Sequence, residues 1–353
     1  MEVDNKLTSD NDLDLHNDLE WQAYATLQQR DFMHTRAFDD ELLTCTGMDD
    51  EFTSVWHYLG WENASQIFEL GSRFLTIQFL CTLQEHKIHV SFRIFGVDYN
   101  LSWITLSQYL GFEESCNLNL DSALPRFNKK TFWKQISGHS RCVQPRTNDI
   151  HHPTLRLLHK WMAISFFPRR DVRIVRDDEM KLLYAAVNKI KVSPAKVMIK
   201  QWRDNFKMTG PVECTSLITH ICERAGALEN SRITFLDAPR TLLDMQHFVQ
   251  GHILKHGPRG SIFYIVADGL DDIRLPNQDY SLYTCQELTM QPRRNDAPRA
   301  STSARVTRSM SMRMPGPGPE APEPSRRMPT PPWDLTSSEA DFWSSGSEPW
   351  NQG

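Results

Sequence analysis

The sequence lacks the short motifs by which most catalytic sites are identified. It contains no Gly-x-Gly-x-x-Gly and no Walker pattern, which excludes a Gly-rich phosphate-binding loop. A Ser-centred nucleophile elbow and the Asp-Ser/Thr-Gly triplet of aspartic proteases are also absent. The adjacent pairs Asp177-Asp178 and Asp271-Asp272 resemble the paired carboxylates that hold two metals in polymerases. We interpret them as helix capping or a solvated loop, and we predict a non-enzymatic protein without cofactors or a small-molecule substrate.

Closely spaced cysteine pairs are missing as well. The seven cysteines are dispersed, and none forms the Cys-x-x-Cys pair of a zinc knuckle or ribbon. Cys214, His220 and Cys222 lie near one another, but their spacing suits a helix face and a fourth ligand is not evident. We therefore predict no metal site, and reduced thiols in an intracellular protein, cytoplasmic or nuclear. Two histidine groups are interpreted as exposed or capping side chains: His86 and His89, and His151, His152 and His159.

Long hydrophobic runs are absent. No stretch approaches the roughly 18 apolar residues of a membrane span, and the N-terminus is acidic, without the basic-then-apolar pattern of a signal peptide. We expect no membrane partner.

The net charge of −5 hides a strong segregation of charge along the chain. Residues 1–51 are mainly acidic, whereas residues 125–207 carry 19 bases against six acids. A basic segment of this kind is the usual electrostatic signature of a nucleic-acid partner.

Apolar periodicity predicts a mainly α fold. Spacings of three and four residues, helix-start prolines and terminal glycines indicate helices over residues 48–58, 64–84, 105–111, 129–137, 153–167, 177–189, 193–207, 214–227 and 238–256. Residues 87–101 alternate like a small β-hairpin, with a turn at 96–98. Residues 262–267 suit either a strand or the apolar end of a helix.

Three regions follow from composition. Residues 1–20 form an acidic, disordered head, residues 21–288 a mostly helical domain, and residues 289–353 a disordered Pro/Ser/Arg-rich tail. The tail repeats tryptophan in an acidic, Ser-rich context at Trp333, Trp343 and Trp350. These tryptophans suit a partner-docking motif, although chance composition is the interpretation we favour.

The basic segment contains the candidate nucleic-acid site. Arg169, Arg170, Arg173 and Arg176 crowd into eight residues after Pro168. The bases predicted to contact phosphates are Arg169, Arg170, Arg173, Arg176, Lys129, Lys130, Arg156 and Lys160. Aromatic residues of the same segment could stack on bases, but their helical spacing favours a core position: Phe132, Trp133, Trp161, Phe166, Phe167, Trp202 and Phe206.

Four stretches together resemble the first-open-reading-frame (gag-like) proteins of Athila-type plant LTR retrotransposons. They are ELGSRFLTIQFLCTL (69–83), FRIFGVDYNLSWITLSQYLGF (92–112), FWKQISG (132–138) and HHPTLRLLHKWMAISFFPRRD (151–171). The resemblance covers residues 38–207, and the first two stretches are also similar to the plant mobile domain of host nuclear proteins. Gln78 stands where the pattern has an acidic residue, and Phe167-Pro168-Arg169 replaces a Gly-containing turn.

The resemblance implies a structural protein that associates with itself and binds RNA or another nucleic acid, although the missing zinc knuckle counts against packaging of RNA. It carries no catalytic residues over to this chain. The alternative is a host-type nuclear module that acts through protein partners.

Overall fold

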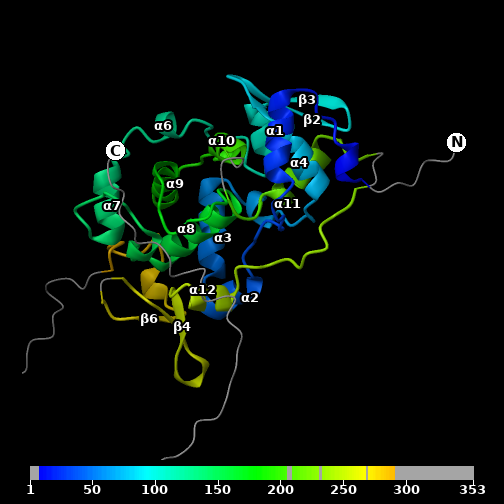
Figure 1. The fold of residues 1–353 in the computed structure, drawn as a ribbon. Helices are drawn as coiled ribbons and strands as arrows, with labels where there is room; N and C mark the ends of the chain where they lie inside the picture. Colours follow the sequence, from blue (N-terminus) through cyan, green and yellow to red (C-terminus); the bar gives the residue numbers. More distant parts are fainter. Residues whose placement is uncertain (1–7, 205–208, 230–232, 268, 291–353) are drawn as a thin grey trace, which may run out of the picture. The chain divides into compact units, whose positions relative to one another are not determined.

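Helices make up most of the regular structure in the computed structural model, which describes residues 8–204, 209–229, 233–267 and 269–290 (Figure 1). The α-helices are α1 (Asp18–Leu27), α2 (Asp40–Thr46), α3 (Asp49–Leu59), α4 (Arg73–Thr82), α5 (Trp103–Tyr109), α6 (Leu120–Ala123), α7 (Lys129–Ser137), α8 (Pro153–Ser165), α9 (Asp177–Val187), α10 (Ala195–Arg203), α11 (Thr215–Arg224) and α12 (Met245–Gln250). The predicted mainly α fold is confirmed.

Two small antiparallel sheets accompany the helices. The first has the order β1 (Gln84–Glu85), β2 (His89–Ile94) and β3 (Val97–Ser102), which confirms the predicted hairpin. Its turn lies one residue earlier than predicted, at Phe95 and Gly96, whose φ angles of 50° and 74° suit the tight turns of hairpins. The second sheet consists of β4 (Leu254–His256), β5 (Ile262–Tyr264) and β6 (Ile273–Leu275). Residues 262–264 are therefore a strand.

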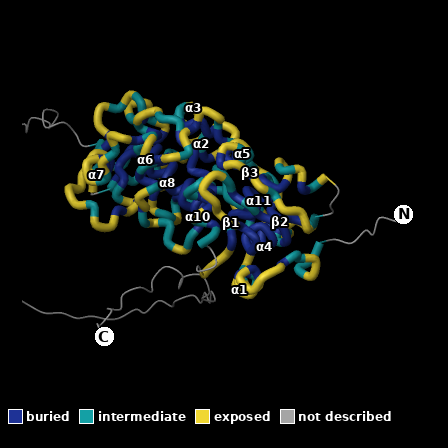
Figure 2. The backbone as a smooth tube through the Cα atoms, turned by 90° about the horizontal axis from the view of Figure 1, so that it is seen from above, coloured by how far each residue is buried: buried dark blue, intermediate teal, exposed yellow. Residues whose placement is uncertain are grey.

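Helix α8 is the centre of the core. Every residue from Pro153 to Ser165 is buried, and Figure 2 shows the buried backbone running through the middle of the unit around α8 and α4. The rings of Trp56 and Phe166 lie 4.6 and 4.5 Å from that of Trp161, centroid to centroid. Around α8, one end of the unit contains α1, α4, α11 and the first sheet, and the other contains α6, α7 and α9 (Figure 1).

Two predicted helices are shorter than expected. Residues 64–84 form a 3-10 turn at Ala64–Gln66 and then α4, which begins at Arg73. Ser72 is the N-cap of α4, and its side chain accepts a hydrogen bond from the Leu75 amide. Residues 238–256 form α12 and then turn into β4. Helices α1, α2 and α6 were not predicted.

Residues 8–20 pack against α4, although the sequence predicts a flexible head. The fully buried side-chain amide of Gln78 accepts a hydrogen bond from Asp14 N at 2.8 Å and donates one to Asp14 O at 2.9 Å. A carboxylate could not make both bonds because it has no donor, which explains why an amide suits this position. Arg73 and Arg93 add ion pairs to Asp10 and Glu20.

The remaining head, residues 1–7, and the predicted tail from residue 291 onward lie outside the described residues, as do the tail tryptophans and Phe206.

Residues 243–290 pack back onto the earlier helices. The Glu51 carboxylate of α3 accepts hydrogen bonds from Ser281 Oγ at 2.7 Å and Leu282 N at 2.6 Å. Short bridges also pair Phe38 with Leu243 and Phe32 with Val212. The core therefore draws on segments that are widely separated in the sequence.

Candidate nucleic-acid interface

The arginine-rich loop between α8 and α9 is fixed by backbone pairing with residues 145–147. Thr147 N donates to Arg173 O at 2.7 Å, Val175 N donates to Pro145 O at 2.9 Å, and Arg146 forms a bridge with Ile174. This pairing brings Arg146 beside the loop.

Arg169 belongs to the interior and not to the predicted interface. Its side chain is 3% exposed, and its guanidinium binds both carboxylate oxygens of Glu179, which is 2% exposed. It also donates to the carbonyls of Asp171 at 2.9 Å and Ile174 at 2.7 Å. With its hydrogen bonds directed inward, Arg169 cannot reach a phosphate without breaking the loop.

The Glu179 carboxylate continues into a buried chain of polar groups. His159 Nε2 lies 3.0 Å from Glu179 Oε2, and His159 Nδ1 lies 2.9 Å from Thr147 Oγ1. The order of hydroxyl, imidazole and carboxylate is that of a hydrolase triad, but all three side chains are buried and Thr147 also donates to Arg173 O at 3.0 Å. The buried hydroxyl cannot reach a substrate, so the chain of groups ties α8 to α9 and to the loop.

Glu179, the carboxylate at one end of this chain of groups, is kept ionised by its neighbours. Burial alone would raise the pKa of Glu179, but the hydrogen bonds and charges of His159 and Arg169 lower it to about 2. Burial lowers the pKa of His159 despite the carboxylate beside it. His159 therefore joins Thr147 and Glu179 through its two ring nitrogens.

Arg156 and Lys160 of α8 are also buried, which corrects their prediction as phosphate contacts. The Arg156 guanidinium donates to the carbonyls of Ile265 at 2.8 Å and His252 at 3.3 Å, so it joins α8 to the second sheet. Burial lowers the pKa of Lys160 to about 8, and the charge of Arg156 adds to this effect. The sequence put both residues on a basic face, but α8 has no solvent-facing side.

The other predicted bases are at least partly accessible. Arg170 and Lys130 are exposed. Arg173 is 54% exposed and pairs with Asp171, its Nε lying 3.0 Å from Oδ1. Lys129 of α7 pairs with Asp177 at the start of α9, and Arg176 binds Gln201.

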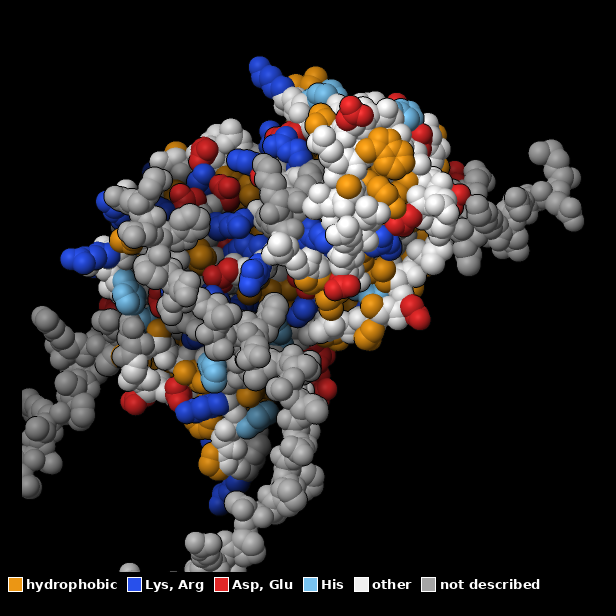
Figure 3. Space-filling view, in the orientation of Figure 1, with side chains coloured by type: hydrophobic (Ala, Val, Ile, Leu, Met, Phe, Trp, Pro, Cys, Tyr) orange, Lys and Arg blue, Asp and Glu red, His pale blue; other side chains and the backbone are white. Residues whose placement is uncertain are grey.

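Further bases join this surface that the sequence did not single out. Arg146 is exposed in the segment that pairs with the loop, and Arg141 is exposed shortly before that segment. Figure 3 shows Lys and Arg side chains gathered over α7, α9 and α10, with acidic side chains between them. Only the backbone pairing of residues 145–147 reveals that Arg146 lies there.

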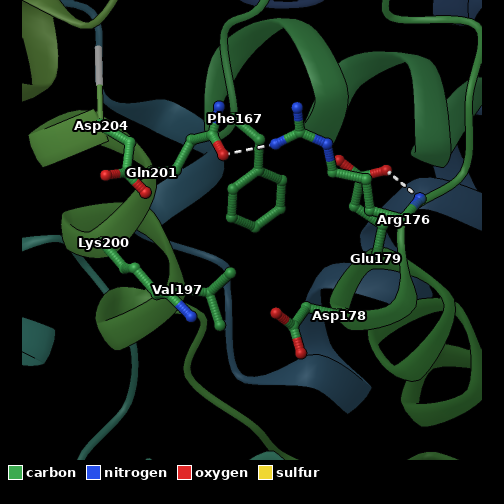
Figure 4. A pocket seen from close by; sticks show the side chains of 8 residues that line it. All are labelled: Phe167, Arg176, Asp178, Glu179, Val197, Lys200, Gln201 and Asp204. Atoms are coloured by element: carbon green, nitrogen blue, oxygen red, sulfur yellow. Dashed lines mark hydrogen bonds between the residues drawn. The ribbon is translucent and has the colours of Figure 1, made fainter. Parts of the chain in front are cut away.

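A small pocket of about 200 Å³ lies between the start of α9 and the side of α10 that carries Val197, Lys200 and Gln201 (Figure 4). Arg176 and Lys200 line it together with the acids Asp178, Glu179 and Asp204. Arg176 N donates to Glu179 Oε2 at 2.9 Å. Because the lining charges are mixed, the pocket does not extend the basic surface as an anion site.

The aromatic residues that the sequence singled out for stacking are core residues wherever the structure describes them, as the sequence favoured. Their side chains are at most 3% exposed: Phe132, Trp133, Trp161, Phe166, Phe167 and Trp202. They cannot stack on bases while the domain is folded.

The candidate zinc ligands of the sequence are not brought together. Cys214 and Cys222 are fully buried, whereas His220 lies beside Glu69, its Nδ1 2.5 Å from Oε1. Burial raises the pKa of both thiols, that of Cys214 to about 12. Three further histidines, which the sequence predicts to be exposed or capping, are buried: His151, His152 and His159. Of these, His152 is the N-cap of α8.

Among the described residues, none of the helices combines the length and apolar character that crossing a membrane requires.

Comparison with known proteins identifies the family of the chain. A family model described as the ATHILA ORF-1 family matches residues 5–223, and the match contains all four stretches on which the resemblance depends. No curated protein and no solved structure matches the chain. Because the family match covers more than half of the 353 residues, the chain belongs to the ATHILA ORF-1 family and derives from a retrotransposon.

Proposed function

We propose that this protein is a non-enzymatic, gag-like structural protein that acts inside the cell, associates with itself and binds nucleic acid through a basic loop surface. We define this surface by four exposed bases: Lys130, Arg146, Arg170 and Arg173. The observation that carries the proposal is the backbone pairing of residues 145–147 with 173–175, which holds Arg146 and Arg173 on neighbouring segments.

The chemistry of the surface favours contacts to phosphates over contacts to bases. Arg and Lys bind phosphate with release of counterions, whatever the sequence of the nucleic acid. The aromatic candidates for base stacking that the structure describes are in the core. Binding through this surface should therefore depend strongly on salt and weakly on base sequence.

The salt dependence of binding tests this proposal. The full chain would be titrated against a single-stranded RNA between 50 and 200 mM salt, with fluorescence anisotropy as the readout. Alanine at all four positions of the basic loop surface should weaken binding. It should also reduce the slope of log K against log salt, by about 0.7 for each phosphate that the variant no longer binds.

A matched control removes four exposed bases elsewhere: Lys87, Arg224, Arg259 and Arg274. It changes the net charge equally, so it should lower affinity through the general field and leave most of the slope intact. Equal slopes for the two quadruple variants would exclude the basic loop surface as the binding site.

Light scattering of the full chain with and without RNA tests self-association. Growth into large, salt-sensitive assemblies supports the gag-like function. If the protein stays a monomer and its mass does not change when RNA is added, the gag-like function is contradicted. That result would favour the alternative, a nuclear protein-interaction module related to the plant mobile domain.

A further inference from the structure

Three side chains with metal-ligand chemistry meet between α11 and the segment that precedes α4. His220 and Glu223 lie three residues apart on α11, so they share one face of the helix. Glu69 faces them from the other segment, and one ligand atom of each residue lies within 4.8 Å of the other two. Among the described residues, this is the group of His, Cys, Asp and Glu side chains with that geometry.

The segment that presents Glu69 is held tightly against α11. Ser72 N donates to Thr219 Oγ1 at 3.1 Å, and Gly71 N donates to His34 Nδ1 at 2.9 Å. A Cβ at Gly71 would lie 2.0 Å from Thr215 Oγ1, so only glycine allows this approach. The position of Glu69 opposite His220 is therefore fixed by backbone contacts independent of its own ion pair.

One oxygen of the Glu69 carboxylate is left without a partner. Oε1 contacts His220 Nδ1 at 2.5 Å, whereas Oε2 is shielded from solvent and has no hydrogen-bond partner among the described residues. A shielded carboxylate oxygen without a donor is costly, and a bound cation would satisfy it.

We propose that Glu69, His220 and Glu223 bind a divalent transition-metal ion of the zinc class, with the fourth position open to water. An imidazole with two carboxylates suits Zn²⁺ better than Ca²⁺ or Mg²⁺, which prefer larger sets of oxygen ligands. Tetrahedral Zn²⁺ separates its ligand atoms by roughly 3.4 Å. The Glu69–His220 contact must open by about 1 Å to admit the ion, and the exposed Glu223 is free to move toward it.

Titration of the full chain with zinc chloride tests this site by calorimetry. A Cys45→Ser background removes the exposed thiol as a competing ligand. We expect one zinc ion whose affinity falls at least tenfold in His220→Gln and in Glu223→Gln. Glu223 is exposed, so its variant should keep the wild-type circular dichroism even if His220→Gln does not fold.

His57→Gln is the matched control, because His57 also pairs with a glutamate, Glu62 at 3.0 Å, without a third ligand at metal-binding distance among the described residues. It should bind zinc like the parent and show the same zinc-dependent rise in melting temperature, which Glu69→Gln should lose. Unchanged zinc affinity in Glu223→Gln, or no binding by the parent, would overturn the proposal. Because no nucleic acid is present, either result is independent of the basic loop surface.

Discussion

Replacing Arg169 by alanine removes the guanidinium that binds both oxygens of the Glu179 carboxylate. It also leaves the carbonyls of Asp171 and Ile174 without their donor. Glu179 is 2% exposed, so its charge cannot be solvated by a small rearrangement. Breaking a buried ion pair by removing one partner costs about 3–5 kcal/mol. His159 remains as a second partner of the carboxylate, so we expect a loss near the lower end, about 3 kcal/mol.

The adjacent Arg170 is the control, because it is exposed and an alanine there should change stability by less than about 0.5 kcal/mol. Urea unfolding, followed by tryptophan fluorescence and circular dichroism, measures both variants against the parent. With slopes of about 1–3 kcal/mol per molar urea, Arg169→Ala should lower the midpoint by at least about 1 M. Equal midpoints for the two variants would refute the structural role of Arg169. If Arg169→Ala stays folded and loses RNA binding while Arg170→Ala keeps it, Arg169 would be part of the nucleic-acid interface after all.

Three further predictions concern buried polar groups. Burial lowers the pKa of His152 to about 3 and that of His247 to about 4. Below pH 6.5 the unfolded chain binds protons that the folded chain does not, so urea midpoints should fall as the pH is lowered from 7 to 4, and equal midpoints at these two pH values would contradict this. Lys160→Met removes a buried ammonium whose pKa is lowered to about 8, so unfolding at pH 7 should require about 1–3 kcal/mol more, and an unchanged melting temperature would contradict this. Gln78→Glu loses the donor to Asp14 O and should cost about 1–3 kcal/mol in urea unfolding, whereas no loss would mean that the head is not held there.

Local signals explain which parts of the fold could be predicted. Helix α7 matches its predicted range because Asn128 caps its start and Gly138, at a φ of 73°, ends it. Pro153 likewise starts α8 as predicted. Helix α1 has a local start signal, since Asn17 caps it, but it packs against α4, a contact that is distant in the sequence and that the sequence analysis could not use.

The candidate site also depends on contacts between residues that are distant in the sequence, which local patterns cannot predict. Arg169 and Arg170 are adjacent in the loop and chemically identical, yet the acid that distinguishes them, Glu179, lies ten residues after Arg169 on α9. Glu69 and His220 are separated by 151 residues, so no spacing rule could join them. Composition found the basic region, whereas burial decided which of its bases face the solvent.

The end of the family match is not the end of the folding unit. The match stops at residue 223, within α11, but Arg156 and Glu51 find their hydrogen-bond partners beyond residue 250. A shortened copy of the reading frame that stops after α11 would retain every family-specific residue. It would also remove hydrogen-bond partners of the buried Arg156 guanidinium and of the Glu51 carboxylate and uncover an apolar surface, so its product should aggregate or be degraded. We therefore expect that truncated copies lose the folded protein while they still match the ATHILA ORF-1 family model.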